Sequence, residues 1–295
     1  MIAIPYAFSL RENAAALRTL AGGWPAVSEE WLKAASRTIR AAHVDPALPN
    51  VARVWNFLVG GRDNFESDRQ AARQLIAAAP VMEHVAPASR AFLRRTVTYL
   101  AAEAGVRQFL DIGTGMPTAG NTHEVAQAID PSCRIVYVDN DPVVLSHARA
   151  GLRSSAEGAT SYLEADARDT KAIIAGASET LDLDRPVGVI MIDILNFLED
   201  AGDVLGRLAE AVPPGSYVTA MQPSRDKRLT VAARRWNQLA TTPVYLRDRD
   251  QVARWFGGLE LVDPGIVEVH RWRPAPGDPD YPDGMPLLGA VGRKP

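Results

Sequence analysis

An apolar stretch that ends in an acidic residue and two glycines, from Gln108 to Gly115, constrains the fold more than any other feature of the sequence. Its first five residues, Gln-Phe-Leu-Asp-Ile, have the β-branched and aromatic character of a buried strand. Gly113 and Gly115 permit a tight turn and leave the backbone open to a ligand. A helix that begins near Gly120 would point its free N–H groups at the same place. The stretch predicts a nucleotide-type cofactor site; the alternative is an ordinary strand-turn-helix corner.

The spacing of the glycines narrows the choice of cofactor. In the dinucleotide fingerprint G-x-G-x-x-G, the third glycine would stand where this chain has Thr118, and the next glycine is Gly120. This spacing argues against NAD and FAD. A wide turn preceded by Asp111 suits a ligand without a pyrophosphate, such as S-adenosylmethionine, which carries an ammonium and a positive sulfonium. We therefore predict S-adenosylmethionine as the cofactor, with Asp111, Gly113 and Gly115 in its site.

Composition excludes several classes of function. The chain has 295 residues and a net charge of −3, which gives no electrostatic footprint for nucleic acid. Its single cysteine, Cys133, rules out an internal disulfide and a cysteine-cluster zinc site, and we expect no metal. Because no apolar run reaches membrane-spanning length and no positive region precedes the N-terminal apolar residues, we expect neither a membrane partner nor secretion. These features favour a cytoplasmic protein.

From Val106 onward, strand and helix patterns alternate, which predicts parallel strands joined by right-handed crossovers. The last two strands are separated by the loop 274–286, rich in Pro and Gly, so the final strand should be antiparallel. The predicted strands are Gln108–Ile112, Arg134–Val138, Thr160–Leu163, Val187–Ile192, Ser216–Met221, Leu259–Val262 and Leu287–Val291. This pattern indicates the α/β fold of class I methyltransferases, a Rossmann-like, mostly parallel sheet of seven strands with an antiparallel last strand.

Helical patterns precede the first strand. Residues 1–45 are predicted to form an N-terminal helical extension, in which Trp31 and Ile39 share one apolar face. That face either packs on the body of the protein, covers a substrate or forms a homodimer. Residues 46–105 are predicted to form a helical cap over the cofactor crevice, with helices over 50–58, 68–79 and 88–104. Residues 106–295 would then form the domain that binds S-adenosylmethionine.

Acidic residues recur at the ends of the strands that follow. Asp139 ends the second strand about two dozen positions after the glycine turn, where a carboxylate can bind both ribose hydroxyls. Asn140 beside it is placed with the cofactor-binding residues, and Asp141 is expected to cap the next helix. After the third strand, Asp166 is the candidate acceptor for the adenine amino group, and Ala167 would pack on the adenine ring.

The fourth strand leads to the candidate catalytic residues. Asp193 and Asn196 follow it directly, and ligands in open α/β sheets bind at the carboxyl ends of strands. Asp193 is the first candidate for a base or for orienting the acceptor, and Asn196 would hold the acceptor or the cofactor amino group. The alternative is that one of them caps the helix that starts near Glu199. His123 is a second candidate base; its other interpretation is a packed or capping residue.

Several segments together resemble the S-adenosyl methyltransferase family common in actinobacteria, long catalogued as a domain of unknown function. They are residues 51–55 (VARVW), 58–65 (LVGGRDNF), 108–115 (QFLDIGTG), 121–126 (NTHEVA), 137–142 (YVDNDP) and 270–274 (HRWRP). The resemblance spans about Asp45 to Pro295 and implies a class I fold and binding of S-adenosylmethionine. It also implies that residues 61–65, with Asn64 among them, form a cap that closes on the cofactor.

The chain departs from this family at its candidate catalytic residues. The family usually has a histidine where Asn196 stands and an apolar residue where Asp193 stands, so we expect a pocket retuned for a particular acceptor. The predicted function is an S-adenosylmethionine-dependent methyltransferase that acts on a small molecule of secondary metabolism. In-line transfer would require the acceptor about 3 Å from the methyl carbon. Two alternatives are a cofactor-binding enzyme that catalyses a cyclisation or rearrangement without methyl transfer, and a regulatory protein that binds the cofactor.

Overall fold

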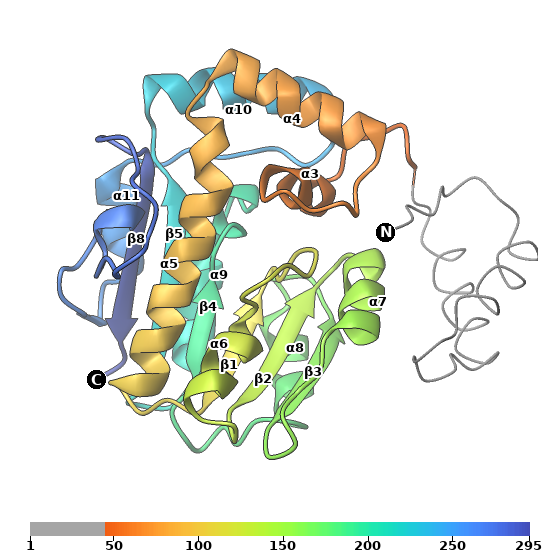
Figure 1. The fold of residues 1–295 in the computed structure, drawn as a ribbon. Coiled ribbons are helices and arrows are strands. Elements are labelled where there is room, and N and C mark those ends of the chain that lie inside the picture. The colour runs from red at the N-terminus through yellow and green to blue at the C-terminus, as the bar shows by residue number, and fades with distance from the viewer. Residues whose placement is uncertain (1–44) are drawn as a thin grey trace, which may run out of the picture. The chain divides into compact units, whose positions relative to one another are not determined.

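The computed structural model describes residues 45–295, which belong to one compact unit (Figure 1). The predicted N-terminal extension, its apolar face with Trp31 and Ile39, and the homodimer expected through it fall on residues outside this range.

An eight-stranded sheet forms the centre of the described unit, in the order β3-β2-β1-β4-β5-β8-β6, and β7 pairs with β8 beside this path (Figure 1). Strands β1 to β5 are parallel, and β8 is antiparallel to β5, as predicted. The strands are β1 Gln108–Ile112, β2 Arg134–Asp139, β3 Ala159–Glu164, β4 Gly188–Met191, β5 Tyr217–Pro223, β6 Glu260–Leu261, β7 Val267–Glu268 and β8 Leu287–Arg293. All seven predicted strands are present, and the short β7 is an addition. This is the class I methyltransferase arrangement.

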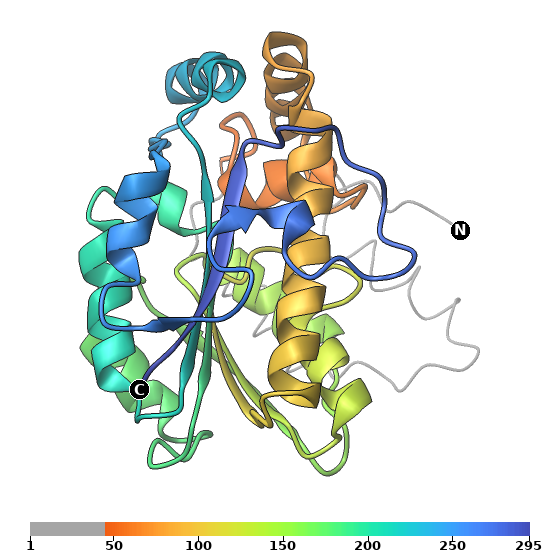
Figure 2. The ribbon, with the colours of Figure 1, turned by 90° about the vertical axis from the view of Figure 1, so that its left-hand side faces the viewer.

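Helices cover both faces of the sheet (Figure 2). One face carries α5 and α6, and the other carries α8, α9 and α11 (Figure 2). Their bounds are α5 Met82–Ala102, α6 Thr122–Ile129, α8 Thr170–Ala177, α9 Ala201–Ala211 and α11 Arg249–Trp255, while α7, Pro142–Gly151, packs on β2 and β3. Alternate residues of β1 point to the two layers: Phe109 belongs to the same core cluster as Phe92 of α5, and Leu110 belongs to the same cluster as Leu205 of α9.

The cap stands at the end of the sheet where β1 to β5 finish (Figure 1). It consists of α3 Val51–Leu58 and α4 Glu66–Ala78, with α10 Lys227–Leu239 packed against α4. The long helix α5 begins at Met82, so the prediction that it begins at Ala88 was wrong. Pro87 lies inside α5, where its missing N–H removes one bond near the start of the helix without ending it.

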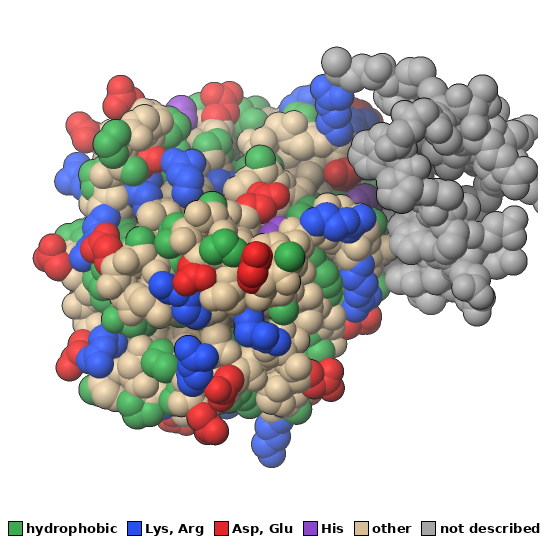
Figure 3. All heavy atoms as spheres, turned by 60° about the horizontal axis from the view of Figure 1, so that its bottom comes forward, with side chains coloured by type: hydrophobic (Ala, Val, Ile, Leu, Met, Phe, Trp, Pro, Cys, Tyr) green, Lys and Arg blue, Asp and Glu red, His purple; other side chains and the backbone are tan. Residues whose placement is uncertain are grey.

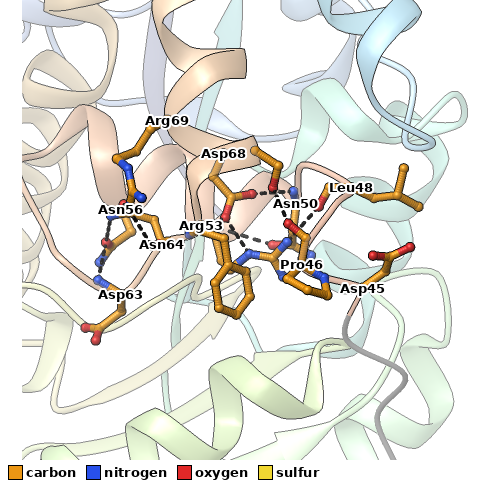
Figure 4. Close-up of polar contacts among 12 residues, drawn as sticks. Asp45, Pro46, Leu48, Asn50, Arg53, Asn56, Asp63, Asn64, Asp68 and Arg69 are labelled. Atoms are coloured by element: carbon orange, nitrogen blue, oxygen red, sulfur yellow. Dashed lines mark hydrogen bonds and ion pairs between the residues drawn. The ribbon is translucent and has the colours of Figure 1, made fainter. Parts of the chain in front are cut away.

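A buried ion pair fixes the cap helices to each other (Figure 4). Asp68 of α4 is fully buried and accepts hydrogen bonds from Arg53 Nε at 2.7 Å and from the backbone N–H groups of Asn50 and Phe65. Arg53 also donates to the carbonyl of Leu48 at 2.8 Å (Figure 4). Because each charged or polar group has a partner, this network holds the start of α3 in a fixed position.

Candidate functional site

A cavity lies at the carboxyl ends of β1 to β4, between the sheet and the helices α3 and α5. We call it the polar cavity; its volume is about 1320 Å³, including its opening to solvent. The sequence-predicted residues that line it are Asp111, Gly113, Gly115, Asp139, Asn140, Asp166, Ala167 and Asp193. The parallel register of the strands places these separate motifs at one edge of the sheet.

Asp111 is the buried carboxylate of the polar cavity. It accepts a hydrogen bond of 2.6 Å from the hydroxyl of Thr122, at the start of α6. Burial raises the pKa of Asp111 to about 6, while the bond from Thr122 and the charge of Arg90 oppose that rise. The side chain is therefore poised to ionise fully beside a cationic ligand.

The glycine turn after β1 serves both packing and access. Gly113 and Gly115 have φ values of 75° and 66°, in the left-handed region. A Cβ at Gly113 would lie 2.6 Å from Cβ of Ile194, so only glycine fits there. A Cβ at Gly115 would meet no atom within 4 Å, so this position leaves the backbone open to the cavity.

Asp139, at the end of β2, stabilises the glycine turn by hydrogen bonding to its backbone. Its two carboxylate oxygens accept from the backbone N–H groups of Gly115 and Asp141, each at 2.9 Å. Each oxygen keeps a free lone pair for a further donor. Asp141 caps α7 by accepting from the N–H of Val143 at 2.8 Å, as predicted, and it also accepts from the Asn50 side chain of the cap.

Asp166 lies at the rim of the polar cavity. It accepts from the backbone N–H of Arg168 at 2.8 Å and from its guanidinium at 2.9 Å. The side chains of Arg168 and Asp166 are 53% and 41% exposed, so solvent screens this pair. Ala167 between them is buried and lines the cavity.

Asp193 links the end of β4 to α3 of the cap and to α5. Its carboxylate accepts from the indole N–H of Trp55 at 2.8 Å and from the hydroxyl of Ser89 at 3.1 Å. Desolvation by the surrounding protein raises the pKa of Asp193 to about 7. Its φ of 60° is unusual for a residue with a side chain. Neither Asp193 nor Asn196 caps α9, whose N-cap is Asp200, so that alternative was wrong.

Three predicted site residues lie outside the polar cavity. Asn196 is buried and lines a second, apolar cavity, and its Oδ1 has no hydrogen-bond partner. His123 lies on α6 with its Nδ1 2.7 Å from the hydroxyl of Tyr137. Asn64 donates to the side chain of Asn56 at 2.8 Å and so stabilises the turn before α4 (Figure 4). The structure therefore does not bring these three together with the other predicted residues.

The start of α6 differs from the prediction of free N–H groups. The backbone N–H groups of Gly120 and Asn121 both donate to the carboxylate of Glu124, which closes a capping box. These donors are satisfied within the protein, so the expectation that they face a ligand was wrong.

Among the lining residues of the polar cavity that were not predicted, Arg90 and Thr118 are hydrogen-bond donors. Arg90 of α5 lines it and donates to the carbonyl of Gly120 at 2.7 Å, and burial lowers its pKa. Thr118 also lines it, and its buried hydroxyl has no hydrogen-bond partner. The sequence contains several arginines in this helix, and only packing shows which one faces the cavity, because Arg94 and Arg95 pair with Asp278 instead.

The charges of the polar cavity fit the predicted cofactor. Carboxylates from the ends of β1 to β4 dominate its wall, which suits a ligand with an ammonium and a sulfonium. Arg90 and the unpaired hydroxyl of Thr118 provide the complementary donors that a carboxylate of the same ligand needs. The residues present therefore fit S-adenosylmethionine.

Residues 45–295 contain neither a metal-binding cluster nor a membrane-spanning helix. In this part of the chain, no group of three or more His, Cys, Asp or Glu residues is arranged to hold a metal ion. Within the same residues, no helix is both long and apolar enough to cross a membrane. Acidic and basic side chains are interspersed on the face that Figure 3 shows.

Comparison with known proteins agrees with the geometry. The sequence profile of the S-adenosyl methyltransferase family matches residues 37–295. A DUF574 family protein from Streptomyces avermitilis shares 39% identity, covers 85% of this chain and 99% of its own, and superposes with a TM-score of 0.82. A candidate methyltransferase from Thermobifida fusca shares 37% identity over 84% of this chain and 96% of its own, with a TM-score of 0.77. No curated protein matches. The chain therefore belongs to the S-adenosyl methyltransferase family and is a methyltransferase that uses S-adenosylmethionine.

Proposed function

We propose that this methyltransferase acts on a small-molecule acceptor of secondary metabolism and holds S-adenosylmethionine in the polar cavity. The observation that carries the proposal is the convergence of Asp111, Asp139, Asp166 and Asp193 on one cavity. These carboxylates lie within two residues of the carboxyl ends of four neighbouring parallel strands, which is where ligands bind in open α/β sheets.

The ribose and adenine of the cofactor are assigned to the ends of β2 and β3. Asp139 would accept from the ribose hydroxyls with the lone pairs that its two backbone bonds leave free, and Asn140 lies beside it. Asp166 would accept from the adenine amino group, and Ala167 would pack on the ring.

The amino-acid end of the cofactor is assigned to the glycine turn and α5. Asp111 would pair with the ammonium, and its pKa would fall from about 6 as a positive charge approaches. Arg90 and Thr118 would donate to the carboxylate. Gly115 permits the close approach because its position is open.

When bound, S-adenosylmethionine supplies a methyl group on a positive sulfonium. Asp193 is our candidate for the base: its carboxylate would take the proton of the acceptor oxygen or nitrogen as that atom receives the methyl group, and the cofactor would leave as neutral S-adenosylhomocysteine once its bond to the methyl carbon is broken. A pKa of about 7 suits this transfer, because the ionised and protonated forms are both accessible near neutral pH. Trp55 and Ser89 fix the direction of the carboxylate. His123 has no such role here, because its ring is engaged by Tyr137.

The sequence alone supports two further parts of the proposal. They are a homodimer through the predicted helices of residues 1–45 and a cytoplasmic setting, favoured by the single cysteine.

The test is calorimetric titration of the full chain with S-adenosylmethionine and S-adenosylhomocysteine. Asp139→Ala should weaken both affinities at least about tenfold, because it removes a charged acceptor from a half-buried site. Asp184→Ala is the matched control, since Asp184 is exposed and lies outside the polar cavity. Unchanged affinity in Asp139→Ala would refute the assignment of the ribose. Screening acceptors for formation of S-adenosylhomocysteine then separates transfer from a cofactor-assisted rearrangement or a regulatory role.

A further inference from the structure

A second cavity lies directly beside the polar cavity, between the cap helices and the segment after β4. We call it the apolar cavity; it measures about 500 Å³, including its opening to solvent. Its wall comes from α3, α4, α5 and α10, from the 3-10 turn Leu195–Phe197, and from residues 223, 244 and 246. Aromatic rings of Trp55, Phe197 and Trp236 form part of this wall.

The wall of the apolar cavity contains a single amide side chain, that of Asn196. The indole N–H groups of Trp55 and Trp236 are both engaged, by Asp193 and by the carbonyl of Thr242. Asn196 is only 2% exposed, and its Oδ1 has no hydrogen-bond partner. A buried acceptor without a partner is costly, so an occupant that donates a hydrogen bond there would be favoured.

The two cavities share a wall. Val51, Trp55 and Phe197 line both of them. The Trp55 indole donates to Asp193 in the polar cavity, so the candidate base stands directly across this wall from the apolar cavity. A molecule in the apolar cavity would therefore contact the same Trp55 and Phe197 side chains that line the cofactor side.

We propose that the apolar cavity is the acceptor subsite and that the acceptor is a small aromatic molecule with a hydroxyl or N–H group that donates to Oδ1 of Asn196. The inference rests on the proposed function, because it takes the polar cavity as the cofactor site. The aromatic class follows from the rings of Trp55, Phe197 and Trp236, which offer faces and edges to a planar molecule. Asn196 acts as a specificity residue, since a molecule of the same shape without a donor leaves its carbonyl unpaired.

The test compares two probes of nearly equal shape, 2-naphthol and 2-methylnaphthalene, by equilibrium dialysis against the full-length protein. The ratio of their affinities should fall about tenfold in Asn196→Leu, because leucine fills the same space and removes the unpaired acceptor. A ratio that is the same in the wild type and in Asn196→Leu would overturn the inference.

Two variants on α10 test whether 2-naphthol binds inside the apolar cavity. Ala233→Phe, on α10, should abolish binding of 2-naphthol by filling the cavity, whereas Val231→Phe on the same helix should not, because Val231 is 48% exposed and lies outside it. Unchanged binding in Ala233→Phe would also overturn the inference. Titration with S-adenosylhomocysteine reports separately on the polar cavity and should be unchanged in all three variants. Failure of the wild type to bind S-adenosylhomocysteine would overturn the proposed function, whatever the probes show.

Discussion

The two cavities are neighbours, yet the chain builds them in different ways. The polar cavity takes its charged groups from the ends of consecutive parallel strands, where each carboxylate follows an apolar run in the sequence. The apolar cavity takes its wall from helices and turns that are far apart in the sequence. Strand ends, which build the polar cavity, suit a cofactor that many enzymes share. Helices and turns build the apolar cavity, so the shape of the acceptor pocket can change when the cap changes.

The cap contributes to the walls of both cavities. Trp55 lines each of them, and Asn50 of the cap donates to Asp141, which lies in the wall of the polar cavity. The buried pair of Arg53 with Asp68 holds the start of α3. A change to this pair should therefore affect both cavities, whereas a change at one strand end should affect only the polar cavity.

The largest effect is expected for Asp68→Ala. This change leaves the Arg53 guanidinium and two backbone N–H groups without their acceptor inside the protein, and such losses destabilise by about 3–5 kcal/mol. Urea unfolding followed by circular dichroism measures the change. Glu66→Ala on the same helix is the control, because its ion pairs with Arg69 and Arg73 are in solvent. Equal stability of the two variants would show that the pair does not hold the cap.

Asp193→Asn should change how stability depends on pH. Burial raises the folded-state pKa of Asp193 to about 7 from an ordinary value of 3.8, so the folded protein keeps a proton that the unfolded chain releases. The stability that this proton provides is present at low pH and is lost as pH rises towards 7. The free energy of unfolding of the wild type, relative to Asp193→Asn, should therefore fall by on the order of 1 kcal/mol per unit between about pH 4 and 7.

Urea unfolding at a series of pH values measures this difference. Asparagine tolerates the positive φ of this position, so the backbone should be unchanged. Asp184→Asn is the control for removal of an exposed carboxylate. A difference between wild type and Asp193→Asn that is constant across this range would mean that Asp193 ionises normally and is a poor candidate for the base.

The contrast between the cavities also explains what the sequence could predict. Asp111 and Asp139 lie near the ends of β1 and β2, and Asp166 lies two residues after β3. Strand patterns in the sequence predict these ends, and the parallel register brings them together without further information. The fold was predictable for the same reason, because alternating strands and helices have few possible topologies. The residues of the polar cavity that come from strand ends could therefore be predicted from the sequence.

Site residues whose positions depend on helix packing could not be predicted from the sequence in this way. Arg90 is one of several arginines in α5, and its position near the glycine turn depends on how that helix lies on the sheet. Asn196 follows β4 closely, yet the turn at Leu195–Phe197 directs it into the apolar cavity rather than beside Asp193. Asn64 and His123 are held by neighbours within the protein, which no local pattern shows.

The smallest effect is expected for Asp166→Asn, which tests whether the rim of the polar cavity matters less than its interior. The amide can still accept from Arg168, so the loop should keep its shape, and only the charge of a partly exposed group is lost. The affinity for S-adenosylhomocysteine should fall by about threefold, since hydrogen bonds in exposed positions contribute little. Binding of 2-naphthol should be unchanged, because Asp166 does not line the apolar cavity. A loss as large as that of Asp139→Ala would place the dominant cofactor contact at the adenine, and a loss of 2-naphthol binding would mean that the two cavities are coupled through the sheet.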